Sequence, residues 1–191
     1  MASAPLPAEV DSLGPLAEAL DALTHDQRVE WLESIPMSQY YTLWDLADGV
    51  GSIDEAYFLH EDGRVRIHDG MNTVPPFRYF QKRFARLDDG IAGYNHPVGL
   101  GRWVVFFQGY GPFVTRPSPE RENEVYVDYT VSPPQHSDFP TVRPIRFTQY
   151  LVYGGMIDVM RRVAADVSIG STEVKGFPVG IGAKFILIRQ P

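Results

Sequence analysis

The chain has 191 residues, of which 44% are hydrophobic and 13% aromatic, and a formal net charge of −7. This length suits one folded domain that needs no disulfide or structural metal. The absence of cysteine excludes disulfides, thiolate catalysis and zinc–thiolate sites. An acidic chain with only three lysines argues against nucleic-acid binding. The first residues lack a signal-peptide pattern, and no apolar run approaches the roughly 20 residues of a membrane span. We therefore expect a soluble, cytoplasmic protein.

The charge is unevenly distributed. Residues 1–60 hold eleven acidic residues and one basic residue, Arg28. The simplest interpretation is a solvated acidic helical face. The alternative is that this segment docks on a basic partner or on the more basic remainder of the chain.

Residues 1–50 are predicted to be helical. Leucines 13, 16, 20 and 23 form one stripe of a first helix, which Asp11 or Ser12 can cap. A capping box at Thr24–Gln27 begins a second helix that ends before Pro36. Ser38 can cap a third helix, with Gly49 as its stop signal.

Residues 55–69 have the pattern of a β-hairpin, because Asp62-Gly63 is a strong signal for a two-residue turn. This register places His60 on the more apolar, buried face and His68 on the opposite face. Residues 77–87 have aromatic residues at helical spacing and predict an amphipathic helix.

Strands are expected near 91–95, 102–108, 112–116 and 125–131, followed by a proline-rich irregular segment at 132–144. Residues 145–163 are apolar on most sides and predict a buried helix, in which Gly154-Gly155 permits close approach of another backbone or a ligand. Two strands follow, around 167–171 and 185–188, with a glycine-rich turn at 175–182 between them.

These elements predict an α+β fold, in which a helical N-terminal segment precedes an antiparallel sheet packed against two helices. We expect an acidic helical segment at 1–50 and an α+β domain at 51–191, together forming one compact domain.

The sequence contains none of the common motifs for hydrolases, zinc proteases, P-loops or dinucleotide binding. The candidate ligand-binding residues are therefore isolated side chains, each with a structural alternative: His60, Tyr94, His96, Asp128, Gly154 and Gly155. Asp128 lies in the middle of an alternating strand, so it must be paired or protonated if its face is buried. An arginine partner such as Arg102 or Arg143 would make it structural. No catalytic residue, metal ligand or cofactor is assigned.

The segment from Val125 to Arg189, which includes VDYTVSPP, YLVYGGMIDVMRRVAADVSIG and AKFILIR, resembles the end of the vinyl-reductase-like and heme-NO-binding-like superfamily. The cysteines common there are absent, and no helical histidine is placed to ligate heme. The resemblance implies a small-ligand sensor or a protein-interaction module.

The leading functional hypothesis is a non-catalytic module that binds a small apolar ligand or a protein partner, with a homodimer as one form. One alternative is an enzyme that uses His60, His96 or His136 with Asp128. Another is a structural subunit that docks through its acidic helices.

Overall fold

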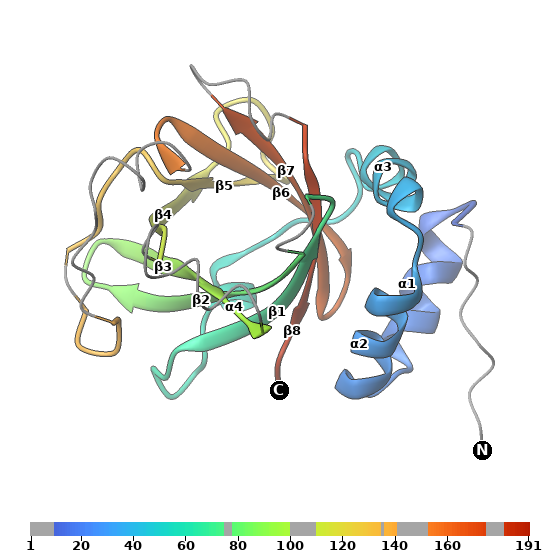
Figure 1. The fold of residues 1–191 in the computed structure, drawn as a ribbon, viewed down its shortest axis with the longest axis horizontal. Coiled ribbons are helices and arrows are strands. Elements are labelled where there is room, and N and C mark those ends of the chain that lie inside the picture. Colours follow the sequence, from blue (N-terminus) through green and yellow to red (C-terminus); the bar gives the residue numbers. More distant parts are fainter. Residues whose placement is uncertain (1–9, 75–77, 100–109, 135, 141–152, 175–181) are drawn as a thin grey trace.

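The computed structural model describes residues 10–74, 78–99, 110–134, 136–140, 153–174 and 182–191. It is a closed antiparallel barrel in which each strand pairs with the next along the chain and β8 closes on β1 (Figure 1). The strands are β1 (Arg66–Asn72), β2 (Tyr79–Leu87), β3 (Gly90–Pro97), β4 (Pro112–Pro117), β5 (Val125–Asp128), β6 (Met156–Ala164), β7 (Val167–Val174) and β8 (Lys184–Arg189). The expected α+β sheet packed against two helices is therefore wrong.

Alternation along each strand divides the wall into an inner and an outer face. Phe84 on β2 is paired with Gly93 on β3 and faces the interior, whereas the next pair, Ala85 and Ala92, faces outward. The expected alternation in residues 125–131 is confirmed on β5, where Val127 lies inside and Tyr126 outside.

The three predicted N-terminal helices are confirmed as α1 (Leu13–Asp21), α2 (His25–Ser34) and α3 (Met37–Leu46). The capping box is present, since Thr24 accepts a hydrogen bond from the backbone of Gln27 and the Gln27 side chain accepts one from the backbone of Thr24. The third helix begins after Pro36 rather than after Ser38.

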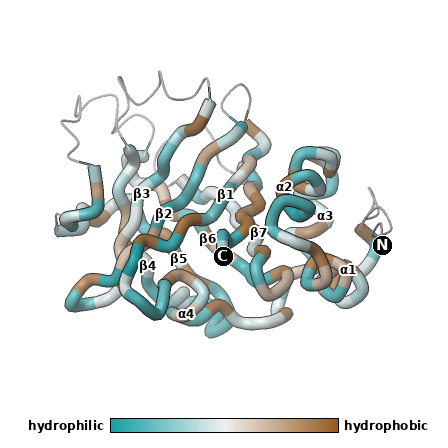
Figure 2. Tube along the Cα trace, turned by 90° about the horizontal axis from the view of Figure 1, so that it is seen from below, coloured by the Kyte–Doolittle hydropathy of each residue, from teal (hydrophilic) through white to brown (hydrophobic). Residues whose placement is uncertain are grey.

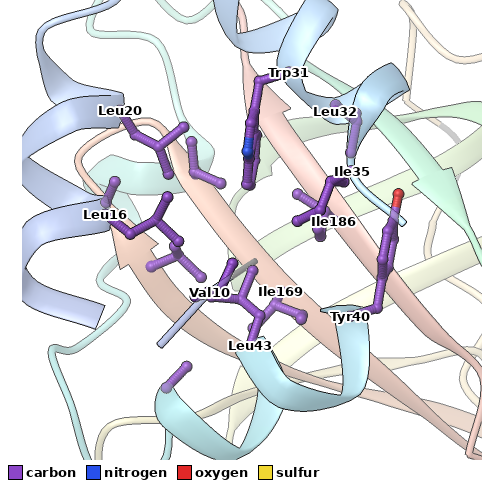
Figure 3. Packing of buried hydrophobic residues seen from close by; sticks show 14 of the residues in the cluster. Val10, Leu16, Leu20, Trp31, Leu32, Ile35, Tyr40, Leu43, Ile169 and Ile186 are labelled. Carbon is purple, nitrogen blue, oxygen red and sulfur yellow. The ribbon is translucent and has the colours of Figure 1, made fainter. Parts of the chain in front are cut away.

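These helices cover the outer face of the barrel where it is most apolar (Figure 3). Leu16, Leu20 and Leu43 from the helices pack with Ile169 of β7 and Ile186 of β8. All five side chains are buried. The strand β8 is therefore apolar on both faces, with Phe185 and Leu187 lining the interior and Ile186 and Ile188 lying beneath the helices, which gather on one side of the barrel (Figure 2).

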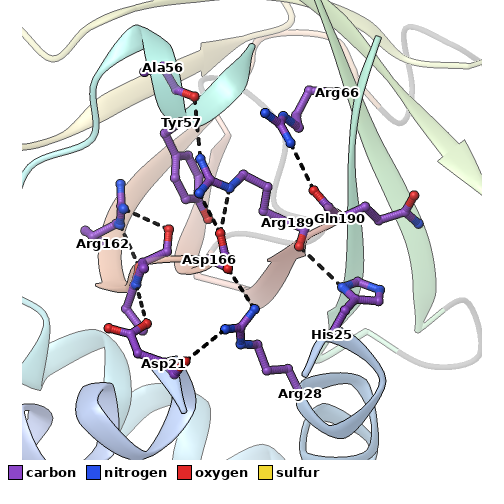
Figure 4. A network of polar contacts seen from close by, with 12 residues as sticks. Asp21, His25, Arg28, Ala56, Tyr57, Arg66, Arg162, Asp166, Arg189 and Gln190 are labelled. Atoms are coloured by element: carbon purple, nitrogen blue, oxygen red, sulfur yellow. Dashed lines mark hydrogen bonds and ion pairs between the residues drawn. The ribbon is translucent and has the colours of Figure 1, made fainter. Parts of the chain in front are cut away.

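Ion pairs join the same helices to one end of the barrel (Figure 4). Arg28 of α2 donates to Asp166 in the β6–β7 turn over 2.7 Å, and Arg189 of β8 binds the same carboxylate. Arg161 of β6 bonds the Trp44 carbonyl on α3, and its guanidinium lies 3.7 Å from the Trp44 ring centroid. Asp48, which follows α3, pairs with Arg121 and Arg161, so the N-terminal segment contributes both a basic and an acidic residue to these contacts.

The predicted hairpin over 55–69 is wrong. Residues Glu55–Phe58 form a short helix, α4, capped by Asp54, and β1 pairs instead with β2 and β8. The Asp62-Gly63 turn exists, with Gly63 at a φ of 78°, but it joins α4 to β1. Tyr57 and Phe58 of α4 enter the interior cluster and close this end of the barrel.

Two predicted helices are also strands. The segment predicted as an amphipathic helix over 77–87 contains β2, and the described part of the predicted helix at 145–163 is largely β6, preceded by a turn at Gly154-Gly155. The expected strand at 102–108 and most of the glycine-rich turn at 175–182 lie outside the described residues. Among the described residues, no helix has the length and apolar character needed to cross a membrane.

Candidate functional site

A buried ion pair crosses the interior of the barrel. Lys82 of β2 donates to Asp158 of β6 over 2.8 Å, and the two side chains are only 1% and 3% exposed. The two strands lie on different sides of the barrel, since β3, β4 and β5 separate them in one direction around the wall. An inward-facing charge on each strand therefore meets its partner inside the barrel rather than in water.

Three polar side chains complete this group, which we call the polar cluster: Lys82, Asn95, Tyr129, Asp158 and Thr172. The Lys82 ammonium donates to Asn95 Oδ1 (3.1 Å), to the Tyr129 hydroxyl and to Asp158. Tyr129 also accepts from Asn95 Nδ2 (2.8 Å) and donates to Asp158 (3.1 Å). The Thr172 hydroxyl donates to the other Asp158 oxygen over 2.9 Å.

Hydrogen bonding is saturated at Lys82 and Tyr129. An ammonium has three N–H groups, and Lys82 uses all three. A phenol offers one donor and two acceptor positions, and Tyr129 uses each of them. Asn95 differs, because it also bonds the Tyr153 phenol and its oxygen keeps a second lone pair beyond the bond from Lys82.

Aromatic rings surround the Lys82 ammonium. The nitrogen lies 4.9 Å from the ring centroid of Phe185, 5.1 Å from that of Phe113 and 5.8 Å from that of Phe80. These distances fall within the range of cation–π attraction. Two glycines on the inner wall make room for such rings, because a Cβ at Gly93 would overlap Phe113 and a Cβ at Gly170 would overlap Phe185.

Burial shapes the ionisation of the cluster. It lowers the pKa of Lys82, and the Asp158 carboxylate opposes this shift. Burial raises the pKa of Tyr129 well above the usual tyrosine value, and the negative charge of Asp158 raises it further. Tyr129 is therefore a neutral hydrogen-bonding group at physiological pH. The cluster therefore combines an ion pair with a protonated phenol.

The two ends of the barrel differ in their connections. At the end near α4 the strands are joined at 88–89, 118–124 and 165–166. At the other end, here called the long-connection end, the links span 73–78, 98–111, 129–155 and 175–183, and the last three of these are longer than any link at the α4 end. Binding residues in β-barrels are commonly carried by the end with the longer loops, since loops vary more freely than strands.

Exposure follows the same asymmetry. Phe80, Asn95, Tyr153 and Thr172, which lie around the polar cluster toward the long-connection end, are partly exposed. By contrast, Tyr57 and Phe58 are 1% exposed at the α4 end. The described interior side chains are therefore more exposed toward the long-connection end, where Tyr153 stacks on Tyr129 with ring centroids 5.3 Å apart and an interplanar angle of 14°.

His68 lies near the α4 end and is fully buried. Its ring lies 5.0 Å from those of Tyr57 and Phe84, and neither ring nitrogen makes a hydrogen bond of normal geometry with a described residue. Burial lowers the pKa of His68 well below the usual histidine value, and the positive charge of Arg189 adds to the shift. His68 is a neutral side chain of the aromatic core, on the face that the hairpin prediction assigned to solvent.

The predicted site residues do not form one site. Tyr94 and His96 are in contact on the outer face of β3, with ring centroids 6.3 Å apart, and Tyr94 packs with Phe139 while His96 stacks on Tyr110. His60 lies in the turn after α4. Gly154 and Gly155 form the turn before β6 and follow Tyr153, which stacks on Tyr129 of the polar cluster.

Asp128 lies on the outer face of β5 and is paired with an arginine. This is the structural role that the sequence offered as the alternative to ligand binding. The partner is Arg116 of β4, at 2.9 Å, whereas the expected candidates Arg102 and Arg143 lie outside the described residues. Asp128 also accepts hydrogen bonds from the backbone and hydroxyl of Thr130, and these bonds with Arg116 lower its pKa against the effect of burial.

Sequence reasoning missed Lys82 and Asp158, which form the centre of the site. Once 79–87 is taken as a strand, Phe80, Lys82 and Phe84 share one face, and a lysine between two phenylalanines on a buried face signals a buried partner. Asp158 gives the same signal, since it is the acidic residue within an apolar run.

No family model, curated protein or solved structure matches the chain. The resemblance to the vinyl-reductase-like and heme-NO-binding-like superfamily stays a prediction from the sequence. Within the described part of the chain, no group of three or more histidine, aspartate or glutamate side chains is placed to hold a metal ion.

Proposed function

We propose that the protein is a non-catalytic module that binds a small, largely apolar molecule inside the long-connection end of its barrel. The observation that supports this proposal is the buried polar cluster, which is ringed by aromatic side chains at the partly exposed end of the interior. An eight-stranded barrel is wide enough either to be filled by side chains or to hold one small ligand. A few fixed polar groups in an apolar setting are typical of ligand sites.

The alternative of an enzyme using His60, His96 or His136 with Asp128 receives no support from the geometry. Asp128 is occupied by Arg116 and Thr130 on the outer wall, while His60 lies in the turn at the α4 end. The alternative of docking through the acidic helical segment is weakened, because one of its acidic residues, Asp48, is already paired with Arg121 and Arg161.

A fluorescence titration with N-phenyl-1-naphthylamine, a neutral aromatic probe, tests the proposal. We expect saturable binding to the wild-type protein. Replacing the inward-facing Asn95 (Asn95→Trp) fills the long-connection end and should abolish binding. Replacing Glu61, an exposed residue in the turn at the α4 end (Glu61→Trp), adds the same ring and should leave binding unchanged.

Circular dichroism and thermal unfolding establish that both variants fold. Equal probe binding by the folded Asn95→Trp protein and the wild type would place the probe elsewhere and refute the proposed site. A wild-type protein that binds no probe would count against ligand binding itself.

A further inference from the structure

We infer that the ligand carries no net charge and is recognised by a hydroxyl, amide or carbonyl group attached to an aromatic or apolar body. This inference rests on the proposed function and adds the chemical class of the ligand. It follows from the charge balance of the polar cluster, from the hydrogen-bonding positions that Asn95 and Tyr153 leave open, and from the rings around them.

Charge balance is the first step. The cluster contains one positive and one negative side chain, Lys82 and Asp158, in direct contact. The next inward-facing positions toward the long-connection end are apolar or neutral, including Phe80, Phe185 and Thr172. Among the described residues, Glu173 of β7 and Lys184 of β8 are charged neighbours of these positions, but both lie on the outer faces of their strands. Lys184 is bonded to Ser171.

Among the described residues, a charged ligand would therefore meet no unpaired counter-charge in the interior. The ammonium has no free N–H to offer an anion, because its three donors are occupied. The carboxylate already accepts from Lys82, Tyr129 and Thr172. An anion or a cation would have to break this network or remain unpaired in an environment of low dielectric, and both are costly.

Asn95 and Tyr153 supply the second step. Asn95 donates to the phenols of Tyr129 and Tyr153 and accepts from Lys82, so in the bonds described its oxygen retains one acceptor position. The Tyr153 phenol accepts from Asn95 and retains its own O–H donor, and its pKa is raised to about 12 by burial. An amide oxygen beside a neutral phenol matches a neutral polar group such as a hydroxyl, amide or carbonyl.

The rings give the third step. Phe80 and Tyr153 are both partly exposed at this end, and Phe80 packs edge to face on Phe185 with ring centroids 5.9 Å apart. Aromatic side chains arranged in this way favour a flat apolar body, which can stack or meet ring edges.

Three probes with one ring distinguish charge from shape: 4-fluorophenol, 4-fluorobenzoate and 4-fluorobenzylammonium. Binding at neutral pH is followed by fluorine NMR. We expect the neutral phenol to bind the wild type at least about tenfold more tightly than either ion. The free-energy cost of one unpaired charge in a setting of effective dielectric about 20 is large enough for this difference.

Asp158→Asn gives the charge-specific test, because it keeps an oxygen acceptor for Lys82 but leaves the cluster positive. In this variant the preference should shift toward 4-fluorobenzoate by about tenfold or more. The matched control is Glu173→Gln, which removes the same charge from an exposed position next to Thr172 and should leave the preference unchanged.

The outcomes separate the two proposals. If a charged probe binds the wild type as tightly as the phenol, the inference about charge is overturned while ligand binding stands. If none of the three binds the wild type, the proposed function and this inference fall together. The wild-type comparison decides the question even if Asp158→Asn does not fold.

Discussion

Lowering the pH should destabilise this protein through His68. The imidazole is fully buried among Tyr57, Phe58 and Phe84, and its pKa is held well below the usual value by burial and by nearby arginines. The unfolded chain binds a proton at this residue near its ordinary pKa of about 6.5. Below that pH the unfolded state holds more protons than the folded state, so stability falls as the pH falls.

The magnitude follows from proton linkage. If His68 stays neutral in the folded protein, moving from about pH 7.5 to about pH 5 removes about 2 kcal/mol of stability through this residue alone. The replacement His68→Leu removes the titrating group and its two unbonded nitrogens. We expect the variant to be as stable as the wild type at pH 7.5, or more stable by about 1–3 kcal/mol.

Urea unfolding at both pH values, followed by tryptophan fluorescence, measures this effect. Trp31 is a suitable reporter, since it is buried between the helices and the barrel. The wild type should lose about 2 kcal/mol more than His68→Leu on acidification. His60→Gln, at a much more exposed histidine, should retain most of the wild-type pH dependence. Equal losses in the wild type and in His68→Leu would refute the account of a neutral, unbonded core histidine.

Three further predictions concern stability and are checked by urea unfolding at neutral pH. Lys82→Met should lower the free energy of unfolding by about 3–5 kcal/mol because it leaves Asp158 buried and unpaired. Adding Asp158→Leu to this variant should recover part of the loss, whereas additive losses from the two substitutions would contradict the ion pair. Gly170→Ala should destabilise the protein by about 1–3 kcal/mol because the new Cβ overlaps a phenylalanine ring. Gly14→Ala meets open space in α1 and should be neutral or stabilising. Similar effects of the two substitutions would contradict close packing at the inner wall. Thr24→Ala should cost about 1 kcal/mol by removing the cap of α2, and an unchanged midpoint would show that the cap is dispensable.

The helical segment could be predicted because its signals are local. A capping box and a leucine stripe specify a helix within one or two turns, and α1 and α2 begin within one residue of their predicted caps. The strand at Val125–Asp128 could be predicted for the same reason, since valines at alternate positions give β5 one apolar face.

The barrel could not be recognised because two of its strands imitate helices. Phe80 and Phe84 are four residues apart, a spacing that places two side chains on one face of either a helix or a strand. The residue between them on the inner face, Lys82, is charged and hides the alternation. Only its partner on β6, far away in the sequence, makes a lysine acceptable there.

The segment Met156–Ala164 was mistaken for a buried helix for a related reason. Met156 and Met160 face the barrel interior, whereas Ile157 and Val159 form an outer cluster against Trp44 of α3. A strand buried on both faces loses its alternation and cannot be told from a buried helix by periodicity. The segment is buried, as expected, but its covering comes from helices near the start of the chain.

Mapping 4-fluorophenol on the protein by NMR tests the central claim most directly. The probe is titrated into isotopically labelled protein, and shift changes are followed at backbone amides and at the Asn95 side-chain amide. The account predicts that the changes gather at the long-connection end, around Asn95, Tyr153 and Thr172, and leave the region of His68 unaffected. Shift changes confined to α1–α3 or to the α4 end would contradict a ligand site at the polar cluster.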